Sequence, residues 1–178
     1  MKSTLALAVV LLVCLCSISL AATMSRIWYS ADDLGAGRWQ YDYEVVNISL
    51  TSPIEEFTIW FGYGAYDNLV IETADPLASD WSEVVWQPEP VVLDDGGYDA
   101  KALGAGIKAD PLDNTVSGFA VSFDWLGLGE PGPQFYEIID SEFVTVDSGM
   151  TKLIPEPATL LLLGLGALAL LRKRRTLE

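Results

Sequence analysis

The sequence predicts an all-β fold, specifically an antiparallel β-sandwich of the jelly-roll-like kind. Three observations predict it. Side chains in the middle of the chain alternate between apolar and polar with a period of two. Clusters of Gly, Pro, Asp and Asn separate the alternating runs, and no middle stretch has the 3.6-residue period of a capped helix. Many short strands punctuated in this way are typical of a sandwich, and a barrel is the alternative closure.

The clearest predicted strands place aromatic side chains on one face and polar ones on the other. Strands of this kind are expected where the alternating apolar residues are Trp39, Tyr41, Tyr43 and Val45; Phe57, Ile59 and Phe61; and Phe119, Val121, Phe123 and Trp125. Shorter strands are predicted at residues 69–71, 84–86, 135–139 and 143–146. Turn-forming residues predict loops at 35–37, 62–64, 88–90, 94–97, 110–114 and 127–133.

The N-terminus has the pattern of a secretory signal peptide over residues 1–21. A basic start at Lys2 precedes an apolar run, and the small residues Ser19 and Ala21 predict cleavage between Ala21 and Ala22. An uncleaved anchor is the alternative. The Sec translocon is the partner expected for export, and residues 22–150 are the predicted extracytoplasmic β domain. Both cysteines, Cys14 and Cys16, lie within the signal, so a disulfide framework is excluded.

Composition excludes several classes of function. The chain has no histidine, which removes the commonest general base at neutral pH and the commonest transition-metal ligand. Of 25 acidic and 10 basic residues, five basic ones and one acidic one lie at the chain ends, which leaves 24 acidic against 5 basic residues. Such an anionic surface repels nucleic-acid phosphates, so no nucleic-acid partner is predicted.

The C-terminal segment, residues 151–178, has three parts in a fixed order. Pro155, Glu156 and Pro157 come first, an apolar run over 158–171 follows, and a basic cluster closes it with Arg172, Lys173, Arg174 and Arg175. Fourteen residues make about 21 Å of helix, short of a hydrocarbon core of about 30 Å. We therefore predict one short transmembrane helix. The basic cluster is expected to stay cytoplasmic and to leave the acidic domain outside.

These three parts, in this order and at this distance from the chain end, resemble the PEP-CTERM sorting signal. The resemblance covers about the last 24 residues. It implies recognition and cleavage by an exosortase near the Pro155-Glu156-Pro157 motif, followed by transfer to the envelope or release. It also implies a Gram-negative host that makes exopolysaccharide. A plain tail anchor, whose linker happens to contain two prolines, is the alternative interpretation.

Two aspartate-rich loops are candidates for calcium, the only metal that the sequence suggests. They contribute Asp94, Asp95 and Asp99 in one segment and Asp110 and Asp113 in another. Carboxylate oxygens in loops suit calcium, which extracellular proteins bind even at weak sites. Neither loop follows the EF-hand pattern. Asp and Gly also build turns without binding any ion, and no other cofactor is predicted.

Exposed tryptophans offer a carbohydrate-binding hypothesis, because aromatic rings can stack on sugars. Trp60 lies on the opposite face from Phe57 and Ile59, and we name Trp60 and Trp86 as possible carbohydrate contacts. No catalytic residue is assigned, although Glu137 is the nearest candidate for a glycan hydrolase. The sequence therefore predicts a non-enzymatic protein, held at the inner membrane as a precursor and then delivered to the envelope, cell surface or exterior. Its predicted role is structural or adhesive, within an exopolysaccharide or biofilm matrix.

Overall fold

The computed structural model describes residues 24–154. They form ten strands and one short helix, which are β1 (Ser25–Gly35), β2 (Arg38–Asn47), β3 (Glu56–Phe61), β4 (Tyr66–Ile71), α2 (Leu77–Asp80), β5 (Trp81–Trp86), β6 (Gly96–Ala102), β7 (Thr115–Trp125), β8 (Phe135–Ile139), β9 (Thr145–Met150) and β10 (Lys152–Leu153).

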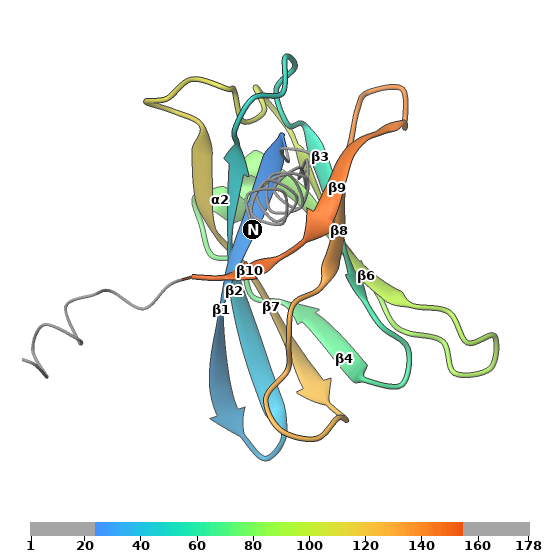
Figure 1. Ribbon diagram of the computed structural model, residues 1–178. Coiled ribbons are helices and arrows are strands. Elements are labelled where there is room, and N and C mark those ends of the chain that lie inside the picture. The colour runs from blue at the N-terminus through green and yellow to red at the C-terminus, as the bar shows by residue number, and fades with distance from the viewer. Residues whose placement is uncertain (1–23, 155–178) are drawn as a thin grey trace, which may run out of the picture.

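The strands form two separate five-stranded sheets that lie face to face (Figure 1). Sheet I has the order β10-β1-β2-β7-β4, and sheet II has the order β5-β6-β3-β8-β9. Within the described residues, all strand pairs of the two sheets are antiparallel except the pair of β1 with β10. The all-β sandwich prediction is confirmed, and the alternative of a barrel is wrong.

The period-two pattern identified the inward faces correctly. In β2, Tyr41, Tyr43 and Val45 are buried, and the residues between them are only half-buried. The inward residues of β3 and β7 are also fully buried, namely Phe57, Ile59, Phe61, Phe119, Val121 and Phe123. Trp39 and Trp125 lie at the margin of the core, partly buried against it.

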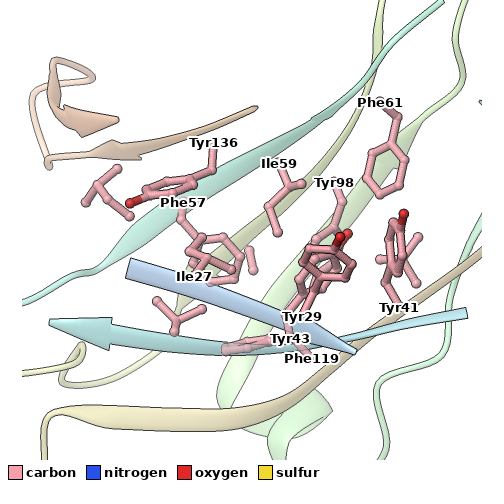
Figure 2. Close-up of a cluster of buried hydrophobic side chains, with 14 of the residues drawn as sticks. Ile27, Tyr29, Tyr41, Tyr43, Phe57, Ile59, Phe61, Tyr98, Phe119 and Tyr136 are labelled. Carbon is pink, nitrogen blue, oxygen red and sulfur yellow. The ribbon is translucent and has the colours of Figure 1, made fainter. Parts of the chain in front are cut away.

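Aromatic rings from both sheets meet in the core between them, as Figure 2 shows for the labelled side chains. Phe57 of sheet II lies 5.0 Å from Phe119 of sheet I, ring centre to ring centre, at an interplanar angle of 81°. Tyr43 stacks on Tyr98 across the same interface at 6.3 Å. Edge-to-face pairs of this kind contribute about 0.5–1.5 kcal/mol beyond their buried area, so the core fixes how the two sheets pack together.

Gln134 satisfies several polar groups inside this aromatic core. Its side-chain Nε2 donates to the hydroxyl of Tyr66 at 3.0 Å, and its Oε1 accepts from Thr151 Oγ1 at 3.2 Å. The backbones of Gln134 and Thr151 are also joined by a 2.8 Å hydrogen bond from the Thr151 N–H. Buried polar groups cost stability unless they are paired, so these contacts allow tyrosines to serve as core residues.

Two local expectations were wrong, and one strand was missed. In the loop predicted at 94–97, Asp94 forms a β-bridge with Glu89, and Gly96 and Gly97 already belong to strand β6, while the turn lies just before it at residues 90–93. The strand predicted at 143–146 begins only at Thr145, because Phe143 has a positive φ of 61° and lies in a turn. Strand β1 was not predicted.

Strand β10 changes the expected exit of the chain from the domain. The sequence predicts a β domain that ends at residue 150, but β10 lies beyond that boundary and pairs in parallel with Trp28 and Tyr29 of β1. The N–H of Ile154 donates to the carbonyl of Tyr29 at 2.8 Å. The chain is therefore fixed to the edge of sheet I up to the last described residue (Figure 1). Sheet I is consequently mixed, which corrects the expectation of a purely antiparallel fold.

The predicted signal peptide with its Ala21–Ala22 cleavage site lies outside the described residues. So do the Pro155-Glu156-Pro157 motif, the apolar run at 158–171 and the basic cluster at 172–175. Within residues 24–154, no helix is long and apolar enough to cross a membrane.

Candidate functional site

The outer face of sheet II brings together the two tryptophans that the sequence singled out. Trp60 comes from β3 and Trp86 from the end of β5, and their ring centres lie 5.6 Å apart. The planes of the two rings meet at 75°, which is an edge-to-face arrangement. We call this pair the aromatic corner. Trp86 is 37% exposed, which leaves part of the corner open to solvent.

Gly97 makes this corner possible. It lies on β6, between β3 and β5, and is the register partner of both Trp60 and Trp86. An ideal Cβ atom on Gly97 would lie only 2.1 Å from Cζ2 of Trp86. The Trp86 ring therefore lies directly over the glycine backbone and crosses β6 toward Trp60. Any side chain at position 97 would occupy the space of the indole.

Two further apolar side chains, Phe135 and Met150, lie on the same face and continue from the aromatic corner across the sheet. We call these four side chains the apolar row. The β3–β8 ladder ends at the pair of Ile59 with Tyr136, and Phe135 is the next residue of β8 beyond that pair, in the direction of Trp60. Phe135 in turn pairs with Met150 on β9. Phe135 is 43% and Met150 50% exposed. Several exposed apolar residues on one face of a sheet are typical of an interaction surface.

A second, polar row runs beside the apolar one. It consists of Asp99, Thr58 and Glu137, which are register partners across β6, β3 and β8. Thr58 Oγ1 donates to Asp99 Oδ1 at 2.8 Å. Burial raises the pKa of Asp99 above its usual value, and the hydrogen bond from Thr58 opposes this shift. The face thus places carboxylate oxygens next to aromatic rings.

Glu137 holds Trp60 in place. Its Oε2 accepts a 3.0 Å hydrogen bond from the indole Nε1 of Trp60, and its Oε1 accepts one of 3.0 Å from Thr145. Each carboxylate oxygen therefore has a protein donor. This geometry explains why a glutamate alternates with apolar residues in β8, and it gives Glu137 a positioning role.

The aspartates considered for calcium are dispersed. Asp95 Oδ1 accepts from the backbone N–H of Tyr63 at 2.7 Å, and Asp110 Oδ1 accepts from that of Leu112 at 3.0 Å. Asp94 belongs to the bridge with Glu89, whereas Asp99 lies on the outer face of β6. Across the part of the chain that the structure describes, no group of three or more acidic, His or Cys side chains could hold a metal ion.

Asp113 lies apart from the other four aspartates. It lines a surface cavity of about 510 Å³ together with Leu77, Asp80, Trp81 and the glycine-rich segment 103–107. The cavity contains none of the other residues that the sequence proposed as ligands.

Sequence reasoning missed Gly97, Phe135 and Met150 as members of this face. Phe135 was predicted in a strand, but its neighbours across the sheet depend on pairing between segments far apart in the chain. Gly97 was interpreted as a turn residue because it follows Asp94, Asp95 and Gly96. A glycine in a strand can also mark close approach of another group, and that signal was available.

Known structures with a similar arrangement are only distantly related. A cohesin module from the family 33 glycoside hydrolase of Clostridium perfringens has a TM-score of 0.44 at 13% identity, covering 74% of this chain and 98% of its own. A family 3b carbohydrate-binding module of Clostridium clariflavum has a TM-score of 0.41 at 10% identity, covering 66% and 93%. A Vibrio harveyi GH20 exo-β-N-acetylglucosaminidase has a TM-score of 0.38 at 10% identity, covering 75% of this chain but 18% of the enzyme. All three scores are below 0.5, so none assigns a function.

The C-terminal segment gives a specific match. No curated protein matches the chain, but the family model of the PEP-CTERM protein-sorting motif matches residues 153–175. The matched region includes Pro155, Glu156 and Pro157 and extends to the end of the basic cluster at Arg175. This agrees with the resemblance seen in the sequence. The chain therefore carries a PEP-CTERM protein-sorting motif, the signal of exported proteins that an exosortase processes at the membrane.

Proposed function

We propose that this protein is a non-catalytic surface or matrix protein with an adhesive or structural role in an exopolysaccharide matrix. The observation that carries the proposal is the direct junction of sorting motif and β-sandwich. Leu153 is both the last residue of β10 and the first residue of the matched motif. A complete folded domain is thus followed at once by a signal for delivery outside the cell.

The outer face of sheet II supports an adhesive role. The aromatic corner is open to solvent, and Phe135 and Met150 extend it. The two oxygens of Glu137 are occupied by Trp60 and Thr145, which supports a recognition surface in preference to a hydrolytic site. We propose no metal or other cofactor for this role.

The processing part of the proposal predicts a new C-terminus. Mass spectrometry of the protein recovered from the host's surface or matrix is expected to find a C-terminus near Pro157, because the motif is the site at which an exosortase acts. A variant with Pro155, Glu156 and Pro157 replaced by alanine should keep its tail and stay with the membrane fraction. The matched control replaces Thr176, Leu177 and Glu178, which lie beyond the matched motif, and should be processed normally.

Mature material that still ends in Arg172 to Glu178 would contradict this prediction. The tail would then act as a plain anchor, and the proposal that the protein is delivered to the matrix would be wrong. Normal processing of the alanine variant would also contradict it, because cleavage would then not depend on the motif.

A further inference from the structure

We propose that the aromatic corner and its extension bind an extended, uncharged polysaccharide chain that lies across the strands of sheet II. This inference rests on the proposed function and identifies the chemistry of the matrix component that the protein contacts. The residues that carry it are Trp86, Trp60, Phe135 and Met150, with Asp99 and Glu137 alongside.

The corner is built for stacking. Trp86 covers Gly97 on its inner side, and its exposed part faces solvent. Trp60 stands at 75° to it, and the indole N–H of Trp60 is engaged by Glu137. What this pair offers a ligand is therefore apolar ring surface held in a fixed geometry. A pyranose ring has an apolar C–H face that matches such a surface, and preorganised rings reduce the entropy lost on binding.

The neighbouring polar row fits the rim of a sugar ring. Each carboxylate oxygen has two lone pairs, so Asp99 and Glu137 can accept from sugar hydroxyls in addition to the hydrogen bonds that they receive from Thr58, Trp60 and Thr145. Small-molecule sites commonly combine an apolar surface with a few oriented polar groups. The apolar row therefore matches the C–H faces of the sugar rings, and the row of acceptors beside it matches their hydroxyl groups.

Charge selects against acidic polymers. Lys101 is the one basic residue in the described strands of sheet II, and its Nζ lies 2.6 Å from Glu56 Oε2. The face consequently has two carboxylates in its polar row and no uncommitted cation from these strands. A uronate or sulfate group placed there would meet like charge, which is a means of rejecting the wrong partner. The ligand class is therefore an uncharged polysaccharide.

The length of the row favours a chain over a single sugar. It runs from β5 through β6, β3 and β8 to β9, which is four strand spacings or about 19 Å at ~4.8 Å each. Contacts spread over this distance can be used together only by an oligosaccharide or polymer. Binding is thus expected to strengthen with chain length.

Affinity electrophoresis of the exported protein, purified from the producing cells, tests this proposal. The gels contain hydroxyethylcellulose as an uncharged polymer, alginate as a polyuronate, or the host's own exopolysaccharide. The wild-type protein should be retarded by hydroxyethylcellulose and not by alginate. Trp86→Ala should weaken binding on the order of tenfold or more, as expected for the loss of a large aromatic contact. Trp28→Ala on sheet I, also a partly buried tryptophan, should not.

Gly97→Ala provides an independent variant that retains every aromatic residue. The added methyl must displace Trp86, so binding should fall as in Trp86→Ala. Gly104→Ala is its matched control, because a Cβ there meets nothing within 4 Å. Circular dichroism establishes that each variant is folded. If Trp86→Ala does not fold, Phe135→Ala replaces it, since the Phe135 side chain is 43% exposed.

The outcomes separate this inference from the proposed function. If the wild-type protein binds the host polysaccharide and the Trp86 and Gly97 variants bind equally well, the aromatic corner is not the site, although the adhesive function stands. Equal retardation by alginate and hydroxyethylcellulose overturns the ligand class. If the protein binds no polymer at all, including the host's, the adhesive function itself fails together with this inference.

Discussion

Replacing Phe57 with alanine is expected to lower the free energy of unfolding by about 3–5 kcal/mol, the usual cost of emptying a large aromatic site in a core. Phe57 is fully buried and contacts the rings of Trp81, Tyr98 and Phe119 at centre distances of 5.0–6.0 Å. It thus joins both sheets. Because small domains are stable by only about 5–15 kcal/mol, this single change removes a large part of the total.

Urea denaturation of the exported protein, followed by tryptophan fluorescence, measures this effect. Phe143→Ala is the matched control. Phe143 is 76% exposed, and the Lys101 ammonium lies 5.0 Å from the centre of its ring, so its removal should cost less than about 1 kcal/mol. Equal losses for the two variants would mean that Phe57 does not carry the packing between the sheets.

Stability is expected to fall steeply above about pH 10, the usual pKa of tyrosine. Burial raises the pKa of Tyr29, Tyr41, Tyr43, Tyr66, Tyr98 and Tyr136 in the folded chain. The unfolded chain therefore loses these protons at a lower pH than the folded chain does. The stabilisation is complete below pH 10 and is lost as pH rises from the unfolded pKa toward the folded one. Several tyrosines act together, so unfolding should be cooperative.

Far-ultraviolet circular dichroism and tyrosinate absorbance, recorded over the same alkaline titration, check this result. Both signals should change at one midpoint. Tyr43→Phe should move that midpoint to higher pH, because Tyr43 is fully enclosed, whereas Tyr63→Phe should leave it in place, because Tyr63 is 41% exposed. Full ionisation of the tyrosines in a protein that keeps its strands would contradict the prediction.

The strands with strict alternation could be predicted from the sequence because one face of each strand packs in the apolar core and the other faces water. Tyr41 and Tyr43 face the core, and Asp42 and Glu44 face outward, so the pattern itself records which side is buried. Strand β1 was missed although Ile27 and Tyr29 alternate in the same way. Its outer face carries Trp28, whose ring lies against Arg26 at 5.1 Å, and this apolar residue obscures the alternation.

The candidate site was predictable only in part. The face that Trp60 occupies followed from its position relative to Ile59, but its contact with Trp86 depends on how β3, β6 and β5 pair. Strand order arises from long-range packing and leaves no local signal in the chain. The role of Gly97 follows from this pairing, because the space that it leaves empty is filled by a residue from a different strand.

The pairing of β1 with β10 joins the first and last strands of the described fold. If the chain is exported from its N-terminus, as the predicted signal peptide implies, β1 crosses the membrane early and its outer edge stays unpaired until residues 152–153 have also crossed. The edge of sheet I can close only when the next residues to follow are those of the sorting motif. The last strand of the fold can therefore pair only shortly before the sorting motif reaches the membrane, so folding is completed just before processing.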